Sequence, residues 1–170
     1  MFWIVAIPLM LFVAFLTIFS FANLFAIISA APFVPSKKKR VDAMIAIADL
    51  QKTDVLLDLG SGDGRIVRRV APLVKESRGI EINSSLVWYA RFVNALTRVK
   101  NAVIINADFW KYNLDDVDVL FVYCIDHRMT KLEEKVKREM KSGARIVSNG
   151  FRFLDWQPES EKDGVRLYRL

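Results

Sequence analysis

The segment from Asp58 to Arg65, DLGSGDGR, has the residue types and spacing that most clearly indicate chemistry. Gly60, Gly62 and Gly64 alternate with other residues, after a short apolar run and before a helical pattern. A strand, a glycine turn and a helix in that order form a nucleotide cradle, because the missing side chains let a ligand touch the backbone and the amides at the helix start face it. The segment therefore predicts a nucleotide-like ligand.

Three classes of ligand use such a turn. A phosphate-binding P-loop ends in Gly-Lys-Ser/Thr, which this segment lacks, and a nicotinamide cofactor prefers its third glycine one position later. Its pyrophosphate would also be repelled by Asp58 and Asp63, whereas S-adenosylmethionine carries a sulfonium and an ammonium group that acidic residues attract. We predict that Asp58, Gly60 and Gly62 hold the methionine part of this cofactor, with Ser61 in the same site. Asp63 also fits a helix cap.

Two further acidic residues stand at predicted strand ends. Glu81 ends the second strand, where a carboxylate accepts hydrogen bonds from ribose hydroxyls, and Asn83 belongs to the same expected site. Asp108 ends the third strand as a candidate acceptor for the adenine amine, beside Phe109 and Trp110, whose rings suit stacking on the base. Strand-end acids are common in such sheets, but three in order favour a cofactor site.

Segments of strand and helix character alternate from residue 54 onward, and this alternation is typical of a parallel sheet with helices on both faces. Such sheets bind ligands at the carboxyl ends of their strands. The helix after Asn83 is expected to be capped by Ser84 or Ser85, and the third helix to end at Gly143. The expected strands are 54–60, 77–81, 101–108, 117–124, 144–150 and a terminal 164–170, which we expect to run antiparallel; the expected helices are 64–74, 84–99 and 131–143, and 151–163 is expected to be an irregular loop.

Residues 1–36 contain no Asp, Glu, Lys, Arg or His, and 1–31 are almost wholly apolar. A helix of about 20 apolar residues crosses a bilayer, so this run is long enough to span one. A cleaved signal peptide is the alternative, but no basic residue precedes the run, and the run is at least about twice as long as the usual hydrophobic region of a signal peptide. A buried core helix is disfavoured because the run has no polar face. We predict a transmembrane anchor over residues 1–31.

Four positive charges, Lys37 to Arg40, follow the anchor. The positive-inside rule then places the amino terminus outside and the rest of the chain in the cytoplasm, or on the equivalent inner side in an organelle. The cluster also suits anionic headgroups, so membrane lipid is an expected partner of residues 1–40. Outside this cluster 21 basic residues face 19 acidic ones, so the charge does not favour nucleic acid. The single cysteine excludes a disulfide framework within the chain and fits a reducing compartment.

Several segments together carry a resemblance: PFVPS at 32–36, DLGSGDGRIV at 58–67, EIN at 81–83, LVWYAR at 86–91, DFWK at 108–111 and FRFLDW at 151–156. The chain resembles the class I S-adenosylmethionine-dependent methyltransferases. More narrowly, it resembles the small membrane-anchored lysine methyltransferases of mitochondria, whose members modify the adenine nucleotide translocase and the ATP synthase c subunit. The resemblance implies an anchored enzyme that methylates lysine in proteins in or at the membrane. It departs after Asn83, where that family tends to have Pro-Trp.

Aromatic residues follow the fourth and fifth predicted strands. Tyr123, Phe151, Phe153 and Trp156 are candidates for the walls of a substrate channel. Such walls lower the pKa of a lysine amine by desolvation and hold methylated ammonium groups. The alternative for these residues is core packing under a long loop.

Three residues near the end of the fourth strand have weaker functional interpretations. Cys124 stands where cytosine carbon-5 methyltransferases place their nucleophile, but those enzymes have proline before it, and a buried small hydrophobe fits better. His127 is a candidate general base or a surface group, and Asp126 is a candidate cap for the next helix. No catalytic side chain is assigned, because methyl transfer requires alignment rather than a protein nucleophile, and no metal site is predicted.

The predicted organisation is an anchor over 1–31, a basic segment with a short helix over 32–53, and a Rossmann-like methyltransferase domain over 54–170. The expected cofactor is S-adenosylmethionine, and the expected substrate is a protein lysine at the membrane. Two alternatives stay open, namely methylation of a lipid or quinone headgroup, and a non-catalytic adaptor that binds the cofactor or its product. The sequence does not determine an oligomeric state.

Overall fold

The computed structural model describes residues 2–29, 35–124 and 128–170. Its centre is a seven-stranded sheet in the order β3-β2-β1-β4-β5-β7-β6. The first five strands along the chain pair in parallel, and β7 pairs antiparallel with β5 and with β6. The strands are β1 (Val55–Leu59), β2 (Glu76–Glu81), β3 (Ala102–Asn106), β4 (Val119–Val122), β5 (Arg145–Asn149), β6 (Ser160–Lys162) and β7 (Val165–Arg169).

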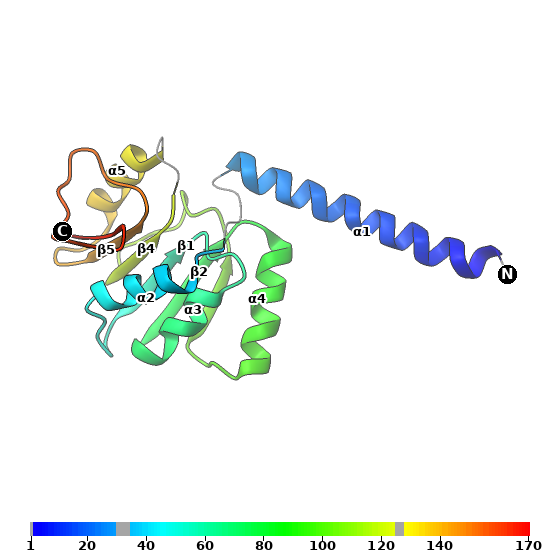
Figure 1. Ribbon diagram of the computed structural model, residues 1–170, viewed down its shortest axis with the longest axis horizontal. Coiled ribbons are helices and arrows are strands. Elements are labelled where there is room, and N and C mark those ends of the chain that lie inside the picture. Colours follow the sequence, from blue (N-terminus) through cyan, green and yellow to red (C-terminus); the bar gives the residue numbers. More distant parts are fainter. Residues whose placement is uncertain (1, 30–34, 125–127) are drawn as a thin grey trace.

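Helices cover both faces of this sheet (Figure 1). α2 (Lys38–Ile47), α3 (Arg65–Val70) with its 3-10 extension (Ala71–Leu73), and α4 (Ser84–Thr97) pack on one face, through two clusters of buried apolar residues. α5 (Met129–Glu139) and the 107–117 connection pack on the other. The central strand β1 is buried along its whole length, which is expected for a parallel strand covered on both sides.

The predicted parallel sheet with an antiparallel terminal strand is therefore confirmed. β6 was not predicted, since it lies in the segment expected to be irregular. It is a three-residue, fully exposed edge strand, and such a strand leaves no hydrophobic alternation in the sequence.

Two expected helix ends were wrong in detail. The cap of α4 is Asn83 rather than Ser84 or Ser85: its side-chain oxygen accepts the amide of Ser85 at 3.0 Å. α5 ends at Glu139, and Gly143 lies in the following turn with a φ of +80°. The candidate residues Asp126 and His127 lie outside the described residues.

The amino-terminal segment forms α1 (Phe2–Ser29), which extends away from the sheet (Figure 1). Its large apolar side chains between Ile7 and Phe19 are mostly exposed. Within the described part of the chain, no helix meets the length and apolar character required to cross a membrane. The predicted transmembrane anchor is thus not confirmed and stays a prediction.

Candidate functional site

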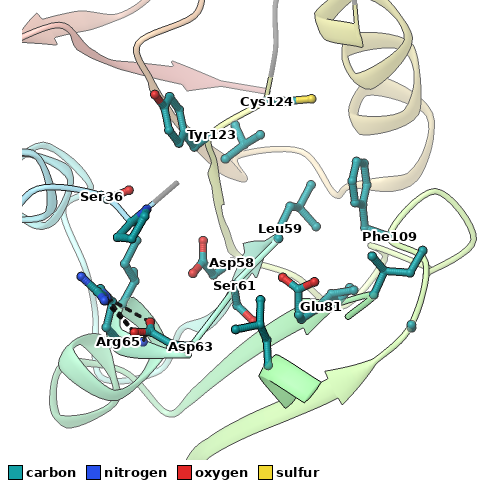
Figure 2. Close-up of a pocket in the computed structure, with 18 of the residues that line it drawn as sticks. Ser36, Asp58, Leu59, Ser61, Asp63, Arg65, Glu81, Phe109, Tyr123 and Cys124 are labelled. Carbon is teal, nitrogen blue, oxygen red and sulfur yellow. Dashed lines mark hydrogen bonds and ion pairs between the residues drawn. The ribbon is translucent and has the colours of Figure 1, made fainter. Parts of the chain in front are cut away.

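A pocket opens where the carboxyl ends of β1, β2, β3 and β4 meet, as expected for a parallel sheet (Figure 2). Its walls combine the glycine turn, the strand ends and the segment that precedes α2. The lining residues are Pro35, Ser36, Asp58, Leu59, Gly60, Ser61, Asp63, Arg65, Ile66, Ile80, Glu81, Ile82, Leu86, Ala107, Asp108, Phe109, Val122, Tyr123 and Cys124.

The glycine turn is held against β2 by its backbone. The amides of Gly60 and Ser61 both donate to the carbonyl of Ile80, each at 2.9 Å. Gly79 makes this contact possible, because a Cβ at that position would lie 2.5 Å from Ser61 Oγ and 2.7 Å from Val67 Cγ2. The turn therefore needs a glycine on the neighbouring strand as well as its own, and this requirement was not predicted.

Glu81 organises the turn from the end of β2. One carboxylate oxygen accepts the amide of Gly62 at 3.0 Å, and the other accepts the amide of Asn83 at 2.8 Å. The buried carboxylate thus joins the turn to the start of α4, and it lines the pocket with lone pairs that are able to accept further hydrogen bonds. Gly62 and Asn83 contribute to the site through these amides and do not line the pocket.

Asp58 is the buried carboxylate at the centre of the pocket (Figure 2). Burial raises its pKa to about 7, and the neighbouring charges of Glu81 and Asp63 act in the same direction. A cation bound beside Asp58 would relieve this repulsion. The ionised form of Asp58 is therefore matched to a positively charged ligand.

Asp63 and Arg65 pair with each other at the pocket rim. The guanidinium of Arg65 donates to both carboxylate oxygens of Asp63, at 2.7 to 3.0 Å. Asp63 also accepts the backbone amide of Arg65 at 3.2 Å, so it supports the first turn of α3, and the charged partner lowers its pKa against the effect of burial. Both residues line the pocket, whereas the N-cap position of α3 is taken by Gly64, so Asp63 supports the helix start from one residue before the cap.

The end of β3 contributes Asp108 and Phe109. Asp108 lines the pocket, and one of its carboxylate oxygens accepts the amide of Trp110 at 3.0 Å. Phe109 is buried, lines the pocket and lies 4.6 Å from the Trp110 ring, measured between centroids. Trp110 itself is not among the lining residues. The structure thus brings Asp58, Gly60, Ser61, Glu81, Asp108 and Phe109 together around one space.

The four candidate channel residues are separated by the structure. Tyr123 lines the pocket, and Phe151 packs against it with 5.8 Å between ring centroids. Phe153 is buried in the hydrophobic core beneath α5, and Trp156 packs on Phe153 and Tyr168. For Phe153 and Trp156 the core-packing alternative describes their positions.

Cys124 is buried in the same core and also lines the pocket, which fits the interpretation as a small hydrophobe.

Pro35 and Ser36 are site residues that strand-end reasoning does not predict. They precede α2 and form one wall of the pocket, and the side-chain amide of Asn149 at the end of β5 lies 3.4 Å from Ser36 Oγ. Residues so far apart in the sequence meet only through the fold. The one signal that pointed to them was the PFVPS segment.

The charge of the lining suits a cationic nucleoside. Among the described residues, four acidic side chains line the pocket, namely Asp58, Asp63, Glu81 and Asp108, and the one basic lining residue, Arg65, is paired. The turn leaves backbone exposed to a ligand, since a Cβ at Gly60 would meet no atom within 4 Å. The residues present therefore fit S-adenosylmethionine better than a phosphate-bearing ligand.

Residues 58–160 match the family described as the ANTKMT methyltransferase domain. The chain is 32% identical over 136 residues to a protein-lysine N-methyltransferase of Saccharolobus islandicus, covering 75% of this chain and 81% of that one. It is 32% identical over 129 residues to the human lysine N-methyltransferase of the ATP synthase c subunit, covering 75% of this chain and 55% of the human protein. The chain thus spans about half the length of its human relative.

Solved structures show the same fold. A crystal structure of an RNA methyltransferase from Salinibacter ruber in complex with S-adenosyl-L-homocysteine has a TM-score of 0.73 and 34% sequence identity, covering 80% of this chain and 92% of that one. A dimethyladenosine transferase from Plasmodium falciparum, at a TM-score of 0.62 and 18% identity, covers 69% of this chain and 43% of that one and supports the fold alone.

Proposed function

Because this chain belongs to the family of ANTKMT methyltransferase domains, we propose that it transfers methyl groups from S-adenosylmethionine to lysine side chains of a protein. The chain is a methyltransferase by family, and the lysine substrate is the proposal. The observation that carries it is the pocket at the glycine turn, which is lined by acidic residues and lies largely within the residues that match the family. The chain is also 32% identical to a protein-lysine N-methyltransferase over most of the length of both proteins.

Different residues of the pocket would bind different parts of the cofactor. The amides of Gly60, Ser61 and Gly62 are taken by Ile80 and Glu81, so the turn would meet the ligand through its open backbone surface rather than through free amides. Asp58 and this surface would hold the methionine part, Glu81 would accept the ribose hydroxyls, and Asp108 with Phe109 would hold the adenine. When bound, the cofactor supplies a methyl group on a positively charged sulfur. The protein has to align the acceptor amine with that group and exclude water.

The acceptor amine has to be neutral to attack, and the ordinary pKa of lysine is about 10.4. Tyr123 stands at the pocket with Phe151 packed on it, and these rings would form an apolar entrance together with Pro35. Such an entrance lowers the pKa of a lysine amine by desolvation, since the charged form loses its water. We assign Tyr123 and Phe151 to the substrate entrance and no residue to a proton-accepting role.

We also propose that the substrate lies in or at a membrane and that residues 1–31 tether the enzyme there. The uncharged stretch of 1–36, the exposed apolar side chains of α1 and the basic cluster Lys37 to Arg40 support this proposal. The amino terminus would then lie outside and the methyltransferase domain on the cytoplasmic side, or the equivalent inner side of an organelle.

The test is methylation of extracts by the full chain with methyl-labelled cofactor. Membrane and soluble fractions are offered separately, and the labelled product is digested and analysed for methylated lysine. We expect label in lysine of a membrane-fraction protein, and none with an Asp58→Ala control. Label in lipid, quinone or RNA would overturn the lysine proposal, and cofactor binding without transfer to any extract would favour an adaptor.

A further inference from the structure

The outward face of α4 carries an uncovered row of large apolar side chains. Trp88, Phe92 and Leu96 are spaced four residues apart and are 70%, 50% and 65% exposed, and Tyr89 beside them is 49% exposed. The rings of Trp88 and Phe92 stack with 5.8 Å between centroids. We call these four residues the α4 patch. A soluble domain rarely leaves such a contiguous apolar patch in water, and one of this kind marks an interaction surface.

The charged residues in and just after α4 are all positive. Residues 82–107 contain no Asp or Glu, and their charged residues are Arg91, Arg98 and Lys100. Arg91 donates to the carbonyl of Ile104 at 2.8 and 2.9 Å, so its guanidinium is held against the edge strand β3 at the flank of the helix. An apolar row of Trp, Tyr and Phe flanked by Lys and Arg is the pattern of helices that lie in a membrane interface.

The position of α4 in the fold points to the same partner. α1 contacts α4, and Figure 1 shows α1 leaving the domain on the side where α4 forms the outer layer. The helices α1 and α4 therefore lie on one side of the protein. A second copy of this chain would bring the positive flanks of two α4 helices together, whereas anionic headgroups would neutralise them.

We propose that the α4 patch rests in the headgroup region of an anionic lipid bilayer. This inference rests on the membrane attachment proposed above and adds an orientation to it. Leu86, in the first turn of α4, lines the cofactor pocket, and Trp88 follows two residues later at the same end of the helix. Contact of the α4 patch with lipid therefore holds the mouth of the pocket near the bilayer surface, within reach of a lysine there.

The orientation is tested with the full chain on vesicles of phosphatidylcholine and phosphatidylglycerol, isolated by flotation. An environment-sensitive fluorophore is attached to a Phe92→Cys variant and, as the matched control, to a Lys162→Cys variant on the exposed edge strand β6. The labelled wild-type chain corrects for Cys124, which is buried. We expect lipids with a nitroxide near the headgroup to quench the probe at position 92 by about half and to leave position 162 unchanged, because an interfacial helix sinks about 5 to 10 Å.

Three results would overturn the proposal: no flotation, flotation with equal quenching at the two positions, or a disulfide between two copies of the Phe92→Cys variant in place of quenching. The readout does not use methyl transfer. A protein that methylates lysine but shows no quenching at position 92 would therefore refute the orientation and leave the proposed function intact.

Discussion

At the scale of single residues, the ionisation of Asp58 makes the charge of the pocket depend on pH. Burial first, and then the charges of Glu81 and Asp63, raise its pKa to about 7, so below that pH the empty pocket holds Asp58 protonated. The unfolded chain ionises this group near pH 4. Asp58 therefore favours folding at low pH, and this contribution is lost as the pH rises from about 4 to 7. A bound cation has the opposite preference, since it requires the ionised form.

Binding of S-adenosylmethionine should accordingly strengthen as the pH rises. Between pH 6 and 7.5 we expect the dissociation constant to fall roughly 5- to 10-fold, in step with the ionisation of Asp58. Calorimetry in buffers of different ionisation enthalpy should show proton release. Asp58→Asn should bind more weakly and lose the slope, while Asp115→Asn on an exposed loop should keep it. A slope that survives in Asp58→Asn would assign the titration to another group.

Glu81 accepts hydrogen bonds from the amides of Gly62 and Asn83, and we expect it to bind the cofactor as well. In a Glu81→Gln variant one acceptor becomes a donor, which faces the amide of Gly62 or of Asn83. We expect cofactor affinity to fall about 10- to 100-fold, the range for losing a charged hydrogen bond. The matched control is Glu159→Gln, at an exposed carboxylate paired with Arg169. Unchanged affinity in Glu81→Gln, measured by calorimetry, would remove Glu81 from the binding residues.

Most of the cofactor side of the pocket could be predicted from the sequence, because its residues follow directly from strand ends. Asp58, Glu81 and Asp108 lie at or just beyond the carboxyl ends of parallel strands, and such ends share one edge of the sheet. The substrate side could not be predicted in this way. Phe153 packs in the core and Ser36 lines the pocket, and both positions depend on the paths of connections that the periodicity of the sequence does not specify.

At the scale of elements, β2 and the glycine turn are fitted to each other. In a Gly79→Ala variant the new Cβ would lie 2.5 Å from Ser61 Oγ and 2.6 Å from Ser61 Cβ, so the turn has to move. We expect stability to fall by about 1 to 3 kcal/mol from overpacking, and cofactor affinity to fall at least about tenfold.

Gly143→Ala provides the comparison for this change. It strains a residue at φ +80° in the turn before β5, at the opposite end of the sheet. It should lower stability by about 1 kcal/mol and leave cofactor affinity unchanged. Equal losses of affinity in the two variants would show that general destabilisation, and not the turn, controls binding.

A buried ion pair fixes the end of α2 to the sheet. Arg145 on β5 donates to Asp54 at 2.6 Å and to the carbonyls of Ala48 and Asp49. Arg145→Met leaves the Asp54 carboxylate buried without its cation, so we expect the free energy of unfolding to fall by about 3 to 5 kcal/mol in denaturant titrations. The exposed Arg138→Met should change it little. If Arg145→Met were as stable as the wild type, the pair would not hold α2.

At the scale of the whole molecule, two helices lie on one side of the protein: the apolar helix α1 and α4, which carries the α4 patch. The pocket wall formed by Pro35 and Ser36 joins them to the site, because this segment stands between α1 and α2 and contacts Asn149 at the end of β5. The path of the chain thus connects the proposed tether to the rim of the pocket. Attachment and catalysis are still separable by substitution, since no described residue of α1 lines the pocket.

Charges placed in α1 should release the protein from membranes without impairing its pocket. Leu11 and Phe15 are 66% and 63% exposed on α1. An arginine in an apolar membrane helix costs about 2.5 to 3.5 kcal/mol, so Leu11→Arg combined with Phe15→Arg should move most of the protein from the membrane pellet to the supernatant. The Leu11→Ala and Phe15→Ala pair should stay in the pellet. Cofactor affinity should match the wild type in both, and methylation of membrane-fraction lysine should fall only in the arginine variant. Retention of the arginine variant in the pellet would mean that α1 is not required for membrane attachment.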